Sequence, residues 1–302
     1  MVRTDGSQPS GTGSNPVGAI LYTAREISII SDSEKEGTME ELRINTERVV
    51  DFVVSFIRDE FKKADFQTAI IGLSGGVDSA VVASLCKLAL GRTNTYGIIL
   101  PYKDTPKESL DHAYLAGRSL GIRYLRFNIT PQIDYYFRNF PQADNIRRGN
   151  KMARERMSIL YDLSYHFQGL VVGTSNKSEI YLGYGTIHGD LAWAINPIGD
   201  LYKTQIYQIA EYLKIPEEII KKKPSAELWP GQTDEEELGI TYQEIDQVLY
   251  YYIDKQMNPE DIVKTKGISE EIVKKVINLV KKNEFKRRPA AIARIPDEIK
   301  YS

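Results

Sequence analysis

Apolar residues recur at helical spacing among charged ones between Met39 and Ala64, and this pattern predicts a long amphipathic helix. After it the period shortens, and β-rich runs predict strands over residues 68–73, 95–100, 124–129 and 170–173. Helical patterns separate these runs, over residues 77–90, 106–120 and 151–167. Strands that alternate with helices form a mainly parallel sheet covered on both faces, so we expect a doubly wound α/β fold.

Beyond Lys203 the pattern is helical throughout. Helices are predicted over residues 203–213, 241–255 and 269–282, and lysines lie on the opposite side of the last one from its apolar residues. We interpret this part as a helical C-terminal layer, which gives a single domain over residues 39–302. Residues 1–38 are rich in Gly, Ser, Thr and Asp, and we interpret them as a disordered tail or leader.

Composition narrows the class of protein. A chain of 302 residues with 42% hydrophobic residues can fill a real core. Lys plus Arg at 39 against Asp plus Glu at 41 leaves a net charge of −2, too little for a field that holds nucleic acid. The single cysteine, Cys86, excludes an internal disulfide and a multi-cysteine zinc site. No apolar run approaches the length of a membrane-spanning helix, about 20 residues. We therefore expect a cytoplasmic protein with neither nucleic acid nor membrane as a partner.

The strand predicted over residues 68–73 runs into Ser74-Gly75-Gly76-Val77-Asp78-Ser79 and then into an apolar helix. The glycines allow close backbone approach, and free amides at a helix start attract an anion. Ser74 and Ser79 can add hydroxyl donors, while Asp78 places a carboxylate beside the phosphates, which requires a cation such as Mg²⁺ between them. An ordinary turn with Asp78 at a helix start is the alternative. The complete string between a strand and a helix favours phosphate binding.

This string resembles the loop of the ATP pyrophosphatases, a superfamily that cleaves ATP between its α and β phosphates and adenylates a substrate oxygen. Downstream blocks resemble the NAD synthetase family in order and spacing, over most of the chain from Asp51 to Pro289. These blocks are Gly149–Met157, Val171–Glu179, Gly183–Asp190, Gly199–Lys203, Pro224–Glu235 and Asn283–Pro289. The resemblance implies an adenine nucleotide alpha hydrolase-like fold. It also implies an ammonia-dependent ligase that amidates nicotinic acid adenine dinucleotide (deamido-NAD) to NAD, with ATP as co-substrate and Mg²⁺ as cofactor.

The resemblance assigns roles to single residues. Those at ATP-contacting positions are Gly72, Leu73, Ser74, Gly75, Gly76, Val77, Asp78, Ser79, Thr174, Lys203 and Ser225. Asp78 and Glu179 are the implied Mg²⁺ ligands. Arg154, Asp190 and Lys286 are the candidates for contacts with deamido-NAD. The catalytic candidates are Asp78, Lys203 and Asp190, with Asp190 placed to orient or deprotonate ammonium.

Several of these residues also have a purely structural interpretation. Arg154 and Arg156 can form a solvated basic face, and Asn176 can be a helix cap with Glu179 on the surface. Cations after the last helix are favourable in any protein. A lone histidine such as His188 is more often structural than a base, and adenylation does not require one.

Three positions depart from the short bacterial enzymes, since Ile187 replaces a lysine, Ala194 an aspartate and Phe285 a histidine. The strings Gly-Tyr-Gly-Thr and Gly-Asp-Leu-Tyr-Lys resemble the synthetase half of the glutamine-dependent branch instead, which leaves the contacts to the nicotinate ring open. That branch carries an amidase domain, for which we expect no room here, and Cys86 lies in an apolar helix as a structural thiol. We therefore expect free ammonia, or ammonia from a separate protein, as the nitrogen donor.

The resemblance implies a homodimer with the dinucleotide at the subunit interface, and the apolar face of the helix predicted from Met39 suits that contact. Two rival functions stay open. Another ATP pyrophosphatase, such as a GMP synthetase or a thiolating enzyme, would need a different C-terminal region or catalytic cysteines. A non-catalytic adenine-nucleotide-binding module would have no use for Arg154 and Glu179.

Overall fold

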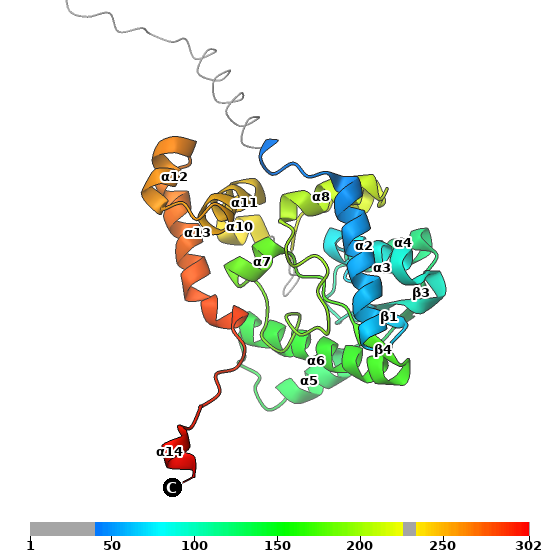
Figure 1. The fold of residues 1–302 in the computed structure, drawn as a ribbon. Helices are drawn as coiled ribbons and strands as arrows, with labels where there is room; N and C mark the ends of the chain where they lie inside the picture. Colours follow the sequence, from blue (N-terminus) through cyan, green and yellow to red (C-terminus); the bar gives the residue numbers. More distant parts are fainter. Residues whose placement is uncertain (1–39, 226–233, 302) are drawn as a thin grey trace, which may run out of the picture. The chain divides into compact units, whose positions relative to one another are not determined.

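The centre of the fold is a parallel four-stranded sheet in the order β3-β2-β1-β4 (Figure 1). The computed structural model describes residues 40–225 and 234–301, so the interpretation of residues 1–38 lies outside the described part. Residues 42–302 form one compact unit. The strands are β1 Thr68–Gly72, β2 Thr95–Ile99, β3 Arg123–Arg126 and β4 Gly169–Val171. Because all pairings are parallel, the carboxyl ends of the strands meet at one edge, where such sheets bind ligands.

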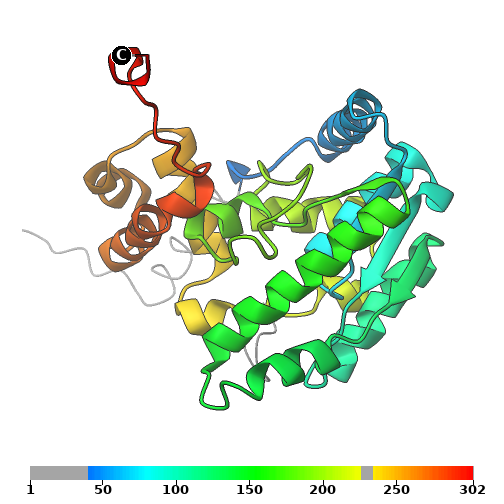
Figure 2. The same cartoon turned by 90° about the horizontal axis from the view of Figure 1, so that it is seen from below.

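Helices cover both faces of the sheet, as the alternating pattern predicted. They are α2 Thr46–Lys63, α3 Val77–Leu90, α4 Lys107–Leu120, α5 Thr130–Phe137, α6 Asn145–His166 and α8 Lys203–Tyr212. Successive side chains of β1 point to opposite faces of the sheet, so neighbouring residues of this strand pack in different cores. Ala69 and Ile71 pack in the core shared with α2, α3, α4 and α8, whereas Ile70 packs in the core shared with α5 and α6. Figure 2 shows α6 running along its face of the sheet. The doubly wound α/β fold is thus confirmed.

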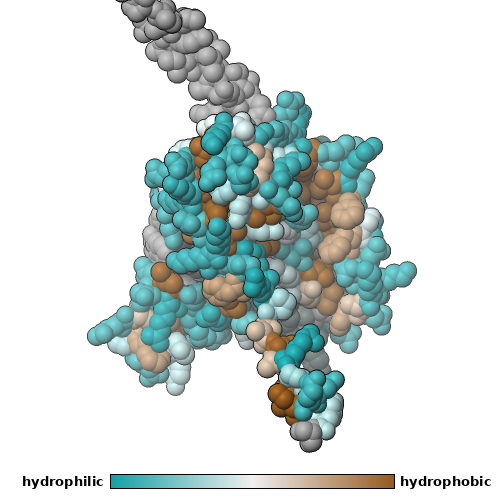
Figure 3. All heavy atoms as spheres, turned by 60° about the vertical axis from the view of Figure 1, so that its left-hand side comes forward, coloured by the Kyte–Doolittle hydropathy of each residue, from teal (hydrophilic) through white to brown (hydrophobic). Residues whose placement is uncertain are grey.

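The C-terminal part is helical and has a core of its own. Its elements are α9 Glu217–Ile220, α10 Asp234–Leu238, α11 Tyr242–Leu249, the π-helical turn Tyr250–Asp254, α12 Pro259–Lys266, α13 Glu270–Lys282 and α14 Asp297–Lys300. Val273, Val276 and Val280 bury the apolar face of α13. The lysines of α13 are exposed. Figure 3 shows that the face of the molecule turned toward the viewer there is largely hydrophilic. Among the helices of the described residues, none is both long and apolar enough to cross a membrane.

The helix predicted from Met39 begins later than its pattern indicated. It starts at Thr46 because the side chain of Asn45 accepts a hydrogen bond from the amide of Arg48 (3.1 Å) and caps it. Leu42, which extended the apparent period, is buried in the C-terminal core instead. The apolar face of α2 packs inside the subunit against α3 and α8, so this face cannot provide the dimer contact expected of it.

Other element boundaries were also misjudged. α6 begins at Asn145 rather than Lys151, capped by Asp144, whose carboxylate accepts from the amide of Arg147 at 2.7 Å. α5 was missed altogether. Its proline stands in the first turn, where the lost N–H has no helical partner in any case. By contrast, α3 has the predicted bounds, between Gly76 and Gly91.

Candidate active site

Three side chains from the first turns of three helices meet at the carboxyl edge of the sheet. Asp78 lies in the first turn of α3, Glu179 in the first turn of α7 (Lys177–Leu182), and Lys203 is the first residue of α8. The Nζ atom of Lys203 lies 2.5 Å from Oδ2 of Asp78 and 3.4 Å from Oε1 of Glu179. The sequence separates Asp78 and Lys203 by 125 positions, and the parallel topology closes that gap.

The loop between β1 and α3 is shaped for close contact with an anion. Gly75 has φ of +85°, and a Cβ atom there would lie only 2.1 Å from the carbonyl oxygen of Ser109, so only glycine fits. Gly76 is the N-cap of α3 and brings no side chain to occupy the first-turn amides. Ser79 Oγ donates to the carbonyl of Gly76 (2.9 Å) and lies 3.3 Å from Ser74 Oγ. Backbone amides and two hydroxyls are therefore gathered beside Asp78.

Charge sets the protonation of this cluster. The side chains of Lys203, Asp78 and Glu179 are only 4%, 15% and 17% exposed. Burial opposes the charge of Lys203, but Asp78 and Glu179 attract its ammonium strongly enough to raise the pKa of Lys203 above its usual value. Burial and the neighbouring Asp78 carboxylate raise the pKa of Glu179 to about 8. Glu179 therefore holds a proton more readily than an exposed glutamate does.

Asn176 organises the two carboxylates. Its side-chain nitrogen donates to Oδ1 of Asp78 (2.9 Å), and its side-chain oxygen accepts from the amide of Glu179 (3.0 Å). Its own amide donates to Oε2 of Glu179 at 3.3 Å, which completes a capping box at the start of α7. The structural interpretation of Asn176 as a cap is thus right. Glu179 is nonetheless part of the cluster and not a surface residue.

The two carboxylates suit a divalent cation only if other ligands come from outside the protein. Within residues 40–225 and 234–301, no three Asp, Glu, His or Cys side chains lie together as a metal site. Mg²⁺ commonly takes one or two carboxylates and completes its shell with phosphate oxygens and water. Asp78 and Glu179 fit that role.

The candidates for the dinucleotide gather around the loop that follows α7. Arg154 Nε donates to the carbonyl of Ile187 (3.2 Å), and Lys286 Nζ donates to the carbonyl of Gly183 at 2.6 Å. Asp190 Oδ1 accepts from the amide of Thr186 at 2.7 Å. Burial lowers the pKa of Lys286. The structure therefore brings Arg154, Asp190 and Lys286 to one loop, with their polar groups bonded to its backbone.

The remaining candidates lie outside the cluster of Asp78, Glu179 and Lys203. Thr174 is half-buried just past the end of β4, and Ser225 is half-buried, next to Pro224, whose carbonyl accepts from the amide of Asp234 at 3.0 Å. Residues 226–233 of that block lie outside the described part. His188 is exposed with φ of +58°, as expected of a turn residue. Cys86 is buried within α3, and burial raises the pKa of its thiol, which agrees with a structural role.

Two contacts near the site were not foreseen from the sequence. Lys222 Nζ donates to Ser109 Oγ (2.8 Å), and Ser109 is the residue whose carbonyl packs against Gly75. The lysine run before Pro224 was the available signal. Ser178 and Asp246 form a second unforeseen contact, behind Lys203. It joins positions 68 residues apart, so no local pattern reveals it.

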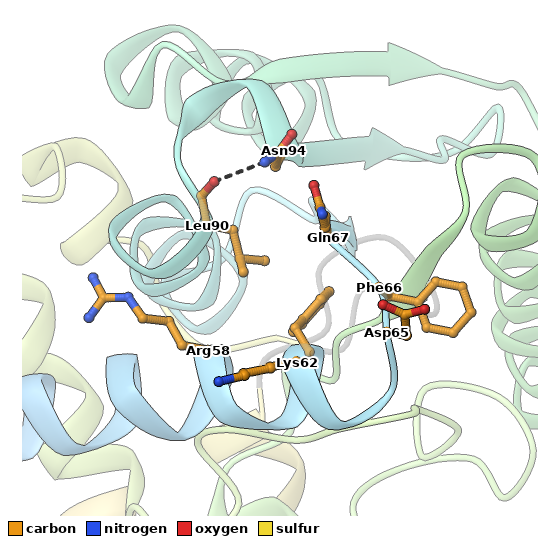
Figure 4. Close-up of a pocket in the computed structure, with 8 residues that line it drawn as sticks. Arg58, Lys62, Asp65, Phe66, Gln67, Leu90 and Asn94 are labelled. Atoms are coloured by element: carbon orange, nitrogen blue, oxygen red, sulfur yellow. Dashed lines mark hydrogen bonds between the residues drawn. The ribbon is translucent and has the colours of Figure 1, made fainter.

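A separate hollow lies at the opposite edge of the sheet (Figure 4). Gln67, which directly precedes β1, and Asn94, which directly precedes β2, line it together with Arg58 and Lys62 of α2. Arg58 donates to the carbonyls at the end of α3 (2.9 and 3.1 Å), so its guanidinium has a structural use. This hollow lies at the amino ends of the strands and is not the candidate site.

The chain is similar to known proteins in sequence and in fold. The family model described as NAD synthase matches residues 49–290. The chain is 50% identical to the NH(3)-dependent NAD(+) synthetase of Fusobacterium nucleatum subsp. nucleatum over 257 residues, which cover 85% of this chain and 99% of that protein. Among solved structures, NMN synthetase from Francisella tularensis gives a TM-score of 0.74 at 31% identity, covering 84% of this chain and 100% of that one. NH3-dependent NAD synthetase from Campylobacter jejuni, in complex with the nitrate ion, gives 0.72 at 34% identity, covering 83% and 100%.

Proposed function

The chain belongs to the NAD synthase family, and we propose that it amidates deamido-NAD to NAD with ATP and ammonia, as a ligase of NAD biosynthesis. The observation that carries this is the meeting of Asp78, Glu179 and Lys203 beside the Ser74–Ser79 loop. A high identity to NH(3)-dependent NAD(+) synthetases supports it. Neither rival, another ATP pyrophosphatase or a non-catalytic nucleotide-binding module, is favoured by the relatives.

The loop binds the triphosphate of ATP in this proposal. The amides from Gly75 onward and the hydroxyls of Ser74 and Ser79 hold the departing pyrophosphate, while Gly72, Leu73, Val77, Thr174 and Ser225 contact the nucleotide. A Mg²⁺ ion on Asp78 and Glu179 would neutralise phosphate charge. The ammonium of Lys203, which lies beside Asp78 and Glu179, stabilises the leaving pyrophosphate.

Two displacements complete the reaction. An oxygen of the nicotinate carboxylate attacks the α phosphorus, the bond to the β-phosphate oxygen breaks, and pyrophosphate leaves an acyl adenylate behind. The nitrogen of ammonia then attacks the acyl carbon, AMP leaves, and the nitrogen loses a proton. Arg154 and Lys286 bind the dinucleotide, and Asp190 orients ammonia. Positioning and charge neutralisation supply the acceleration, so no nucleophilic side chain is needed.

One comparison raises a second candidate substrate. The name of the similar protein from Francisella tularensis points to a mononucleotide product. The phosphate loop and Lys203 would serve either substrate equally, because both present a nicotinate carboxylate to ATP. The choice between the two substrates would depend on the residues that contact the substrate. Among these candidates are the three positions that differ from the short bacterial enzymes, Ile187, Ala194 and Phe285.

Assembly and location are part of the same proposal. We expect a cytoplasmic homodimer, supplied with free ammonia or ammonia from a separate protein. Support for a dimer comes from exposed apolar side chains on α5 and α6, among them Tyr135, Ile146 and Tyr165. Native mass spectrometry tests it, and a monomer at micromolar concentration would remove this part.

One incubation tests the function. The protein is given ATP, Mg²⁺ and ammonium with either deamido-NAD or nicotinic acid mononucleotide. We expect NAD, AMP and pyrophosphate in equal amounts from deamido-NAD, and little turnover of the mononucleotide. Asp78→Asn should remain folded by circular dichroism and lose Mg²⁺-dependent turnover. Undiminished turnover by that variant would overturn the metal assignment but leave the overall reaction standing.

A further inference from the structure

Asp246 is a fully buried carboxylate that lies behind the candidate site. It belongs to α11, and its exposed fraction is 0%. Oδ1 accepts a hydrogen bond from the hydroxyl of Ser178, and Oδ2 accepts one from the amide of Thr204 at 2.8 Å. The Ser178 hydroxyl in turn accepts from the amide of Lys203 at 2.9 Å. One carboxylate from a third helix thus joins the first turns of α7 and α8.

These bonds act on the part of the backbone that carries the charged side chains. Ser178 immediately precedes Glu179 in α7, and Lys203 and Thr204 are the first residues of α8. The amides of a first helical turn lack partners within their own helix, so whatever accepts from them fixes where the helix begins. The Lys203 amide is held by Ser178 and the Thr204 amide by Asp246. The relative position of Glu179 and Lys203 is therefore fixed by this arrangement.

We propose that Asp246, acting through Ser178, is a positioning residue that holds the start of α8 so that the Lys203 ammonium reaches Asp78 and the ATP phosphates. The inference rests on the proposed function for its catalytic consequence. The structural part of the inference, that Asp246 and Ser178 hold the first turns of α7 and α8 together, does not depend on the proposed function.

Two observations favour a positioning role for Asp246 over a role in which it only fills space in the core. A buried carboxylate is unfavourable, and burial raises the pKa of Asp246 to about 6, whereas an apolar residue would fill the same place without that penalty. α11 also approaches the side chain of Lys203, because the centroid of the Tyr242 ring lies 5.4 Å from Lys203 Nζ. The helix that carries Asp246 thus holds the amide next to Lys203 and also places an aromatic ring near its ammonium.

The first test uses pyrophosphate exchange into ATP, which reports adenylation without ammonia. In the presence of deamido-NAD, Asp246→Ala should lower the exchange rate about 10- to 100-fold while the KM for ATP changes less than about threefold. Asp246→Asn keeps an acceptor for the Thr204 amide and should recover much of the rate. The control is Glu244→Ala on the same helix, where the carboxylate caps only α11 itself.

A double-mutant cycle decides whether Asp246 acts through Lys203. In a Lys203→Met background, Asp246→Ala should change the remaining exchange rate less than about twofold, because the group it positions is gone. Equal fold-losses in both backgrounds would overturn the proposal, and so would Asp246→Ala retaining at least half of the wild-type rate.

Amide hydrogen exchange separates this inference from the proposed function. Exchange at Lys203 and Thr204 should be faster in Asp246→Ala than in Glu244→Ala, whatever reaction the protein catalyses. If the wild type shows no pyrophosphate exchange, the proposed function fails. If those amides stay protected in Asp246→Ala, the positioning role fails.

Discussion

Replacing Lys203 by methionine tests the electrostatics of the candidate site. Methionine keeps most of the volume and removes the ammonium that lies 2.5 Å from Asp78. Removing one partner of a buried ion pair destabilises a protein by about 3–5 kcal/mol, since the other charge stays buried. The side chain of Asp78 is 15% exposed, so the lower end applies, about 3 kcal/mol. In a domain of this size that corresponds to about 6–12 °C in Tm.

Magnesium should reverse this loss. With the ammonium gone, Asp78 and Glu179 are left for the metal alone, and a ligand at 100 times its Kd adds about 2.7 kcal/mol. Thermal unfolding of both proteins in EDTA and in saturating Mg²⁺ measures the effect. We expect the Tm of Lys203→Met to rise by several degrees more than that of the wild type, in which Lys203 already neutralises the carboxylates.

Lys63→Met is the matched control, because Lys63 pairs with Glu60 on the surface with side chains 70% and 30% exposed. Such pairs contribute about 0–1 kcal/mol. The reasoning would be refuted if Lys203→Met in EDTA were as stable as Lys63→Met. Equal Tm shifts by Mg²⁺ in the wild type and Lys203→Met would refute the shared metal site.

Three further predictions concern the loop, the buried carboxylate and the substrate side. Gly75→Ala combines φ of +85° with a contact of 2.1 Å to a carbonyl oxygen and should abolish ATP binding in calorimetry. Gly91→Ala, at φ of +86° with open space around it, should lower the free energy of unfolding in urea by only about 1–2 kcal/mol. Equal effects of the two substitutions in these assays would contradict the account. The folded-state pKa of Asp246, about 6, exceeds the unfolded value of 3.8, so its contribution to stability is complete below pH 3.8 and is lost as the pH rises through 6. Between these pH values Asp246→Asn should lose less stability than the wild type. Parallel curves of stability against pH for the two proteins would refute the shift. Lys286→Met should raise the KM for deamido-NAD about 10-fold and leave the KM for ATP unchanged, unlike the exposed Lys282→Met, and an unaltered KM would remove Lys286 from the substrate site.

Local patterns predicted those parts of the fold that local physics decides. The helix at Val77–Leu90 was bounded correctly because a continuous apolar run stands between glycines that end it on both sides. The start of α2 was misplaced because the apolar period continues through Leu42, and only the tertiary structure shows that Leu42 belongs to the C-terminal core. Burial in a second core overrode the helical period there.

The candidate site divides in the same way. The glycine loop with Asp78 carries its own signal, since strand, glycines and helix start are adjacent in the sequence. Glu179 and Lys203 required the resemblance to a family, because their approach to Asp78 depends on the crossover connections of the sheet. Asp246 lies 42 positions from the amide it holds, and nothing in its helix distinguishes it from an ordinary polar residue.

Oxygen transfer from the substrate tests acyl adenylation most directly. Deamido-NAD labelled with ¹⁸O in the nicotinate carboxylate is converted with ATP, Mg²⁺ and ammonium. The ¹⁸O content of the phosphate-containing products is then measured by mass spectrometry. Attack of that carboxylate on the α phosphorus, held by the Ser74–Ser79 loop and Lys203, must leave one labelled oxygen in AMP and none in pyrophosphate. Label in inorganic phosphate with ADP as the nucleotide product, or unlabelled AMP, would contradict the account.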